Sequence, residues 1–144
     1  MHQALRPATT QDILSVCAML RPDDDKEFRL ASGREPKDVL LSTPDVLAMV
    51  VPETGEVIGL CGVRPSSLIP EAGLIWMCGT VNLRHHRVAF TRFARHWVRT
   101  FKGKYSVLHN AVWSGNKMHV AWLNAIGFRF LAPHGDFIPF YMDL

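Results

Sequence analysis

The residues best spaced for chemistry lie in the segment 112–128, which reads VWSGNKMHVAWLNAIGF. From Asn116, His119 is three residues on and Leu123 seven, so the three share one face of a predicted helix that ends at Gly127. His119 is the ionisable group of that face, and an imidazole with a pKa of ~6.5 can donate a proton at neutral pH. Its alternative role is a hydrogen bond to a neighbouring loop.

A second candidate is the run of basic residues at the start of another predicted helix: Arg84, His85, His86 and Arg87. Phosphate groups bind to the amides of a helix start and to guanidinium groups. Cations there oppose the helix dipole, so the run reduces helix stability. This cost suggests a functional role, either in binding phosphate or in binding another ligand, and a solvated surface loop is the alternative.

The remaining ionisable groups give weaker patterns. Glu71 lies just before the predicted central strand and His109 lies on the next strand, so both are candidates for a general base, and a structural or solvated role is the alternative for each. Cys78 ends an apolar run, which favours a core thiol over a nucleophile. The acidic run 23–25 predicts a solvated helix start, because consecutive helical residues point in different directions. We expect no metal site.

Strands and helices that would position these groups follow from periodicity and turn residues. Helices are predicted from a Thr9–Asp12 capping box to Pro22, from the acidic run to residue 31, over 88–102 and after Asn116, with a turn or short helix at 36–41. Strands are predicted at 3–6, 46–51, 57–63, 73–78, 106–113, 128–131 and 137–141. The near-continuous apolarity of 73–78 predicts the centre of the sheet.

The predicted helix 88–102 has two faces. An aromatic stripe is predicted to face the core, and it consists of Phe90, Phe93, Trp97 and Phe101. The opposite face is basic, and it consists of Arg92, Arg95, Arg99 and Lys102. Because the aromatic rings turn away from the arginines, we do not expect nucleic-acid binding by base stacking. The basic face is available to solvent or to an acidic partner.

Composition and charge place limits on the class of protein. With 144 residues, 48% hydrophobic and 20% charged, we expect one soluble globular domain over 1–144. Three cysteines without CxxC spacing predict buried thiols in a reducing compartment, and there is no apolar run that resembles a signal peptide or a membrane span. Residues 1–71 hold 7 basic and 11 acidic side chains, and residues 72–144 hold 9 and 2, so the net charges are −4 and +7. The basic half should attract a polyanion.

The segment after residue 112 resembles the last strand–helix unit of the GNAT (GCN5-related N-acetyltransferase) superfamily. Its pattern there is Asn-x-x-Ala-x-x-hydrophobic-Tyr-x-x-x-Gly-Phe. Asn116, Gly127 and Phe128 fit this pattern, whereas His119 replaces the usual small residue and Leu123 replaces the Tyr. The GNAT phosphate loop, Arg/Gln-x-x-Gly-x-Gly/Ala, is matched at its ends by residues 84 and 89, but an arginine stands at residue 87 in place of Gly.

A narrower resemblance covers roughly residues 57–131. Trp-x-Gly-Asn-x-x-His, with Leu in the Tyr position, is similar to small tailed-phage GNAT-like proteins of the internal virion protein A type. Those proteins are associated with phage particles or assembly. The resemblance therefore implies a GNAT fold that need not carry out plain acetyl transfer.

The two resemblances imply an α+β fold with a mixed, mostly antiparallel twisted sheet and helices on both faces. The first implied function is transfer of an acetyl group from acetyl-CoA to an amine of a small molecule or protein, with His119 as the acid. The implied cofactor-binding residues are Met77, Cys78, Gly79, Arg84, His85, His86, Arg87 and Asn116. The alternative is a non-catalytic phage virion, assembly or host-interaction protein with an acidic partner. In either case we expect it in the cytoplasm of the host or in the virion.

Overall fold

The computed structural model describes residues 4–144, in which strands form a seven-stranded, mostly antiparallel sheet in the order β1-β2-β3-β4-β5-β7-β6. The predicted α+β class is confirmed, and the apolar strand 73–78 is the middle strand, β4. The contacts cluster into two compact units, one running to Gly62 and including Met77–Arg87, and the other comprising Val63–Trp76 and Val88–Leu144. No helix of the described part of the chain is long and apolar enough to cross a membrane.

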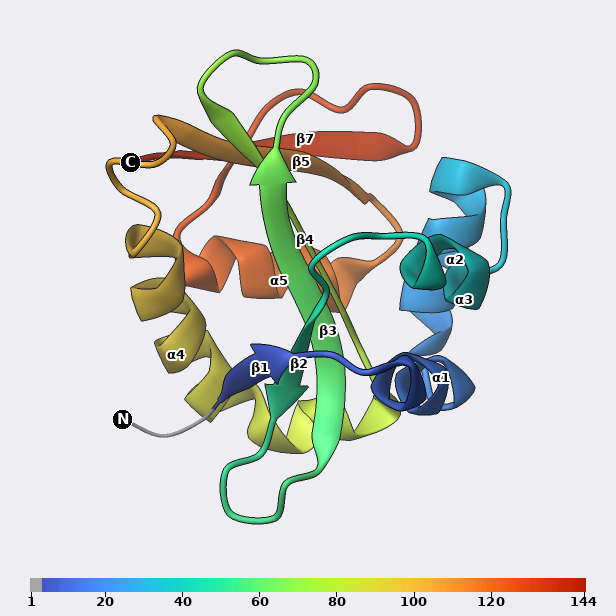
Figure 1. The fold of residues 1–144 in the computed structure, drawn as a ribbon. Helices are drawn as coiled ribbons and strands as arrows, with labels where there is room; N and C mark the ends of the chain where they lie inside the picture. The colour runs from blue at the N-terminus through green and yellow to red at the C-terminus, as the bar shows by residue number, and fades with distance from the viewer. Residues whose placement is uncertain (1–3) are drawn as a thin grey trace. The chain divides into compact units, whose positions relative to one another are not determined.

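The first unit contains three helices and the N-terminal strands. Its elements are β1 (Leu5–Pro7), α1 (Thr10–Ala18), α2 (Pro22–Ser32), α3 (Pro36–Leu41), β2 (Leu47–Val50), the first part of β3 (Val57–Pro65), the end of β4 (Ala72–Gly79) and the 3-10 helix η1 (Val81–His86). β2 and β3 form the predicted antiparallel hairpin. The three helices lie side by side, with α3 contacting both α1 and α2 (Figure 1).

The start of α1 has the predicted capping box. Thr9 Oγ1 accepts the Asp12 amide at 3.1 Å, and the Asp12 carboxylate accepts the Thr9 amide at 2.8 Å. Arg6 of β1 also donates to Asp12, at 2.6 Å. The hydrogen bond from Arg6 is the main reason that the pKa of Asp12 falls to about 2. The cap therefore ties β1 to α1 as well as starting the helix.

The prediction that the acidic run 23–25 is simply solvated is wrong for its middle residue. Asp24 is only 4% exposed, whereas Asp23 and Asp25 are half-buried. Asp24 pairs with Arg21 at 2.8 Å and accepts the Gly79 amide at 2.8 Å. A residue 55 positions away supplies the partner that makes this burial possible, so the local sequence could not indicate it.

The second unit is built around two long strands and two helices. Its elements are the first part of β4, α4 (Arg87–Arg99), β5 (Val107–Trp113), α5 (Lys117–Ile126), β6 (Arg129–Phe130) and β7 (Phe137–Asp143). β5 and β7 are paired antiparallel over seven residues, whereas β4 and β5 are parallel and paired over only three, from Ala72 with Val107 to Leu74 with His109. The two helices are joined by hydrogen bonds from Trp122 Nε1 to Thr91 Oγ1 (2.8 Å) and from Arg95 Nε to the Ala125 carbonyl (2.7 Å).

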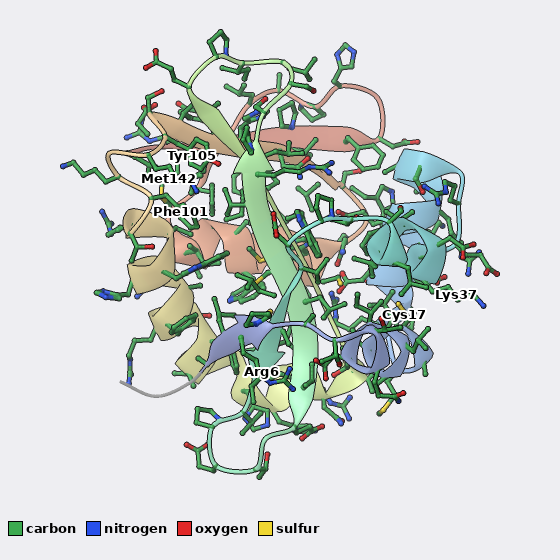
Figure 2. The ribbon with its side chains drawn as sticks, in the orientation of Figure 1. Arg6, Cys17, Lys37, Phe101, Tyr105 and Met142 are labelled. Carbon is green, nitrogen blue, oxygen red and sulfur yellow. The ribbon has the colours of Figure 1, made fainter. Side chains whose placement is uncertain are left out.

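The aromatic stripe of α4 faces the core only in part. Phe90 is buried, and the other buried residues of α4 are Ala94 and Val98, whereas Phe93 and Trp97 are half-buried. Phe101 lies beyond the helix, and its ring is 6.1 Å from that of Tyr105 (Figure 2). The basic side chains opposite the stripe are exposed, as predicted.

Candidate functional site

The end of β4 carries the main-chain groups that the GNAT resemblance assigns to cofactor binding. Met77, Cys78 and Gly79 are all buried. The Gly79 amide donates to Asp24 Oδ2 at 2.8 Å, and the Gly79 carbonyl accepts the Arg21 amide at 3.0 Å. The polar groups of this residue therefore bond to Arg21, just before α2, and to Asp24 in the first turn of α2.

These bonds lie on a definite edge of β4. The next amide, of Thr80, donates to the Ile58 carbonyl of β3, and successive residues of a strand direct their polar groups to opposite edges. The polar groups of Gly79 therefore point to the edge opposite β3. On that edge Leu20 and Thr80 form an antiparallel bridge, and the Val81 amide donates to Met19. The α1–α2 connection thus pairs with the edge of β4 that β3 leaves open.

Cys78 has a neutral thiol. It is 3% exposed, and burial is the first cause that raises its pKa well above the ordinary value, followed by the charge of Asp24. The prediction of a core thiol agrees with this environment. Cys61 is also buried, which raises its pKa to about 12.

The predicted phosphate-binding residues form part of a helix rather than a glycine-rich loop. Arg84, His85 and His86 close η1, and Arg87 begins α4. Arg84, His85 and Arg87 are exposed, and Arg84 Nε lies 3.4 Å from His85 Nε2. Among residues 4–144 neither arginine of the run forms an ion pair. The run therefore presents three exposed cationic or basic side chains, and His86 is half-buried.

The second unit holds Asn116, His119 and Leu123. The predicted shared face exists and is a buried one, with exposures of 0%, 8% and 0% in that order. Asn116 is the N-cap of α5, and Gly127 ends the helix with φ of 119°. The His119 ring lies 6.4 Å from that of Trp122, and neither Asn116 nor His119 is free. Leu123 fills the position of the GNAT Tyr with an apolar, enclosed side chain.

The two candidates for a general base, His109 and Glu71, make different contacts. His109 Nε2 is 2.8 Å from Ser66 Oγ, and desolvation lowers its pKa. Glu71 is exposed and has a positive φ of 61°, and its carbonyl accepts the Ser106 amide. In this arrangement His109 contacts the Ser66 side chain, and the Glu71 main chain holds Ser106 just before β5. No cluster of three His, Cys, Asp or Glu that could bind a metal occurs among the described residues.

The β4–β5 ladder ends early, and a side chain occupies its end. Asn110 Nδ2 donates to the Ile75 carbonyl at 2.7 Å, directly after the last pair, Leu74 with His109. Beyond this point in the second unit, the main chains of the two strands are no longer paired. Such a divergence is one feature that a cofactor arm inserted between strands would need.

A cationic cavity of about 250 Å³ lies near the end of α5. Arg99 of α4 and Arg129 of β6 line it together with Gly127, Met142 and Asp143. Both arginines are exposed, and neither is in an ion pair within residues 4–144. With the carboxylate of Asp143 counted, the two guanidinium groups leave the lining with a net positive charge, which suits a carboxylate or another small anion.

Sequence reasoning missed Arg21 and Asp24, which close the edge of β4. The only local signal is their i, i+3 spacing at a helix start, which also occurs in solvated pairs. It also missed that Arg99 and Arg129 line the same cavity, because these residues are 30 positions apart and belong to different elements.

Comparisons with known proteins give two kinds of match. Residues 75–135 match the family described as "Bacteriophage T7, probable scaffold protein Gp13", which is less than half of the chain. No curated protein matches the sequence.

Several solved structures share the fold over almost the whole chain. The GNAT domain of S. lividans PAT has a TM-score of 0.72 at 14% identity, covering 97% of this chain and 89% of that one. The GNAT-family acetyltransferase from Bacillus anthracis has 0.69 at 13%, covering 98% and 94%. A Bacillus subtilis acetyltransferase in complex with CoA has 0.64 at 12%, covering 97% and 96%. The chain therefore has the fold of the GNAT acetyltransferases.

Proposed function

We propose that this protein is a non-catalytic phage assembly protein that uses a GNAT fold to bind an acidic partner. The observation that carries the proposal is the pairing of Gly79 with Asp24 and Arg21. In GNAT enzymes the corresponding main chain aligns the arm of the cofactor. Here the amide and carbonyl of Gly79 are already bonded within the protein, so this residue is not open to a cofactor in the structure.

Two further features support this proposal. Arg87 stands where the GNAT loop has a glycine, and Leu123, fully buried, replaces the Tyr that protonates the departing thiolate in many GNAT enzymes. The match of residues 75–135 to a phage scaffold family supports a role in particle assembly. We infer that the protein acts in the host cytoplasm or within the virion, as do proteins that build the particle.

The partner-binding surface that we propose is the basic face of α4, which comprises Arg92, Arg95 and Arg99 of the helix together with Lys102 in the turn that follows it. Arg95 is less available to a partner, because it already donates a hydrogen bond to the Ala125 carbonyl near the end of α5. Arg92, Arg99 and Lys102 are exposed without ion pairs in the described chain. Arg99 continues this face into the cavity that it shares with Arg129, where a partner carboxylate would be held by two guanidinium groups.

The cofactor part of the proposal is tested by thermal unfolding with acetyl-CoA. A genuine site should stabilise the fold by ~2.7 kcal/mol at 100-fold excess over Kd. We expect no shift at millimolar acetyl-CoA. A saturable shift, accompanied by acetylation of an amine substrate, would overturn the proposal.

The assembly part is tested in the phage that encodes the chain. The charge-reversal variant Arg92→Glu/Arg99→Glu/Lys102→Glu should strongly reduce the yield of infectious particles. The control Arg34→Glu/Lys37→Glu/Arg64→Glu changes the net charge by the same amount at exposed positions elsewhere. Equal yields from the two variants would reject the basic face of α4 as the partner-binding surface.

A second candidate is an acetyl-CoA-dependent N-acyltransferase, which the early end of the β4–β5 ladder favours. In that function Asn116 and the run 84–87 would bind the cofactor, His119 would be the proton donor, and the acceptor would be an amine of a small molecule or a protein. This candidate requires that the α1–α2 connection release Gly79. Acetyl-CoA binding that weakens sharply in Arg84→Ala/Arg87→Ala would support it.

A further inference from the structure

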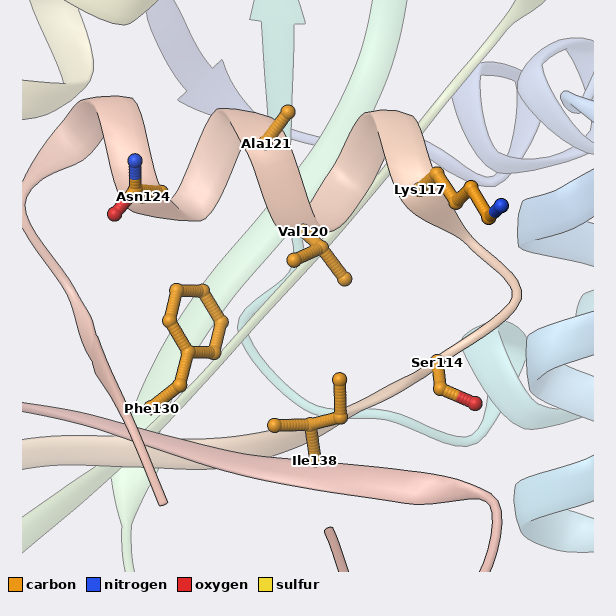
Figure 3. Close-up of a pocket in the computed structure, with 7 residues that line it drawn as sticks. All are labelled: Ser114, Lys117, Val120, Ala121, Asn124, Phe130 and Ile138. Carbon is orange, nitrogen blue, oxygen red and sulfur yellow. The ribbon is translucent and has the colours of Figure 1, made fainter. Parts of the chain in front are cut away.

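A groove of about 390 Å³ lies between α5 and the strands β6 and β7. Its lining consists of Ser114, Lys117, Val120, Ala121, Asn124, Phe130 and Ile138. Figure 3 shows Val120 pointing from α5 toward Ile138 and Phe130, with Lys117 and Ser114 at one end of the groove and Asn124 at the other. The groove is therefore apolar in the middle and polar at both ends.

The burial of the lining residues indicates what kind of ligand fits. None of the seven is buried: Ser114, Lys117, Ala121 and Asn124 are exposed, and the three large apolar residues are half-buried. Small-molecule sites usually enclose 70–90% of their ligand. An open groove of this size instead suits an apolar side chain that is carried by another protein, whose surface covers the rim.

The charge of the groove lining indicates which residue of the partner should lie beside that side chain. Lys117 is the charged residue of the lining, and no acidic residue lines the groove. Lys117 forms no ion pair within residues 4–144. A carboxylate beside the inserted apolar side chain would complement this cation, whereas a basic residue would be repelled.

We propose that this groove docks a partner protein through one large apolar side chain with an acidic residue next to it, which pairs with Lys117. The surface is distinct from the basic face of α4 and does not depend on it. The proposal goes beyond the assembly role, because it assigns a second contact that combines apolar burial with charge. Apolar anchors in pockets supply much of the energy of protein interfaces.

The test uses nuclear magnetic resonance with isotope-labelled protein and the model peptide acetyl-Ser-Asp-Leu-Phe-Glu-Ser-amide. We expect saturable shifts of the amides of Lys117, Val120, Asn124 and Phe130. Two control peptides replace the acidic residues by Lys or the Leu-Phe pair by Ser-Ser, and each should bind several-fold more weakly. Shifts confined to α4, or equal binding of the Lys peptide, would overturn the proposal. Stronger shifts of the same amides with octanoate would also overturn it, in favour of a small-molecule site.

Two variants separate the contributions of charge and apolar contact. Lys117→Glu should weaken the acidic peptide on the order of tenfold and should make the Lys peptide the better ligand. Val120→Trp should fill the groove and abolish binding of all three peptides. Lys104→Glu, an exposed reversal in the turn before β5, should leave binding unchanged. A Lys117→Glu variant that keeps the original preference would reject the assigned pair, and circular dichroism shows whether each variant is folded.

The outcome is independent of the proposed function. Arg92→Glu/Arg99→Glu/Lys102→Glu removes the basic face of α4 and should leave peptide binding at the groove in place. If particle yield falls while peptide binding persists, the two surfaces act separately. If this variant loses the peptide shifts, the groove is not the peptide's binding site.

Discussion

Replacing Asp24 by Ala should destabilise the first unit more than any other single change on α2. The substitution removes one ion pair of Arg21 and the acceptor of the Gly79 amide at once. Arg21 is only 12% exposed in its side chain, so little water can replace the lost ion pair. Both losses act on the same point, the pairing of the α1–α2 connection with the edge of β4.

The magnitude follows from these contacts. An amide left buried without an acceptor costs ~1–3 kcal/mol, and removing one member of a buried ion pair costs ~3–5 kcal/mol when the other member stays buried. Because Arg21 keeps some access to solvent, we expect about 3 kcal/mol in total for Asp24→Ala. For a domain of this size that corresponds to a fall in Tm of roughly 10 °C. Asp24→Asn keeps an acceptor for Gly79 and should lose less, about 1–2 kcal/mol.

Urea unfolding at pH 7 measures these differences, with Asp23→Ala as the matched control. Asp23 is the half-buried neighbour in the same first turn, and its loss should cost only about 0.5 kcal/mol through the helix dipole. Equal effects of Asp24→Ala and Asp23→Ala would refute the assigned contacts. Asp24→Ala also frees the Gly79 amide, so acetyl-CoA should stabilise this variant more than the original protein if Asp24 is what excludes the cofactor.

Three further predictions concern the pH dependence, the end of α5 and the thiols. Because the pKa of Asp12 is lowered to about 2 from 3.8, its pairing with Arg6 contributes stability above pH ~4 that is lost as the pH falls toward 2. Asp12→Asn should therefore cost about 1 kcal/mol at pH 7, allowing for solvent screening at Arg6, and much less near pH 2, where Asp12 is partly protonated in the folded protein, as measured by urea unfolding. Gly127→Ala should cost about 1–2 kcal/mol in thermal unfolding, because φ is 119° there and side chains disfavour positive φ. Iodoacetamide should label native Cys17 slowly, because burial raises its pKa despite nearby Lys37 (Figure 2), and should leave Cys78 unlabelled until the protein unfolds.

Each of these has a clear contrary result. An Asp12→Asn variant that stays equally destabilised at pH 2 would show that packing, not charge, is responsible. A Gly127→Ala variant as stable as the original protein would mean that α5 can end in another conformation. Rapid labelling of Cys78 in the folded protein, read by mass spectrometry, would show that the end of β4 opens readily.

Much of the fold could be predicted from local patterns. The Thr9–Asp12 capping box, the helix end at Gly127 and the apolar middle strand all follow from short-range rules of capping, positive φ and apolar periodicity. The three-residue spacing of Asn116 and His119 likewise predicted their shared face. Periodicity overestimated how many aromatic residues of α4 are buried, because the buried positions of that helix are Phe90, Ala94 and Val98.

The site was less accessible to such reasoning. The resemblance to GNAT enzymes assigned the residues of a cofactor site by their positions in a motif, and that assignment stays a prediction. Whether their polar groups are open to a ligand depends on partners distant in the chain. Gly79 is bonded to Asp24, 55 residues away, and Leu123 is enclosed in a core that no local pattern describes.

The sequence by itself thus determined the elements, since helix caps, glycine turns and apolar periodicity act over a few residues, and the GNAT architecture was expected from the resemblance of the segment 112–128. Only the tertiary structure decided how the edge of β4 is used. Hydrogen bonds between distant segments form when the chain is folded, and they satisfy the amide and carbonyl of Gly79, which the GNAT resemblance assigns to a cofactor. The groove beside Lys117 arises in the same way, because α5, β6 and β7 meet only in the folded chain.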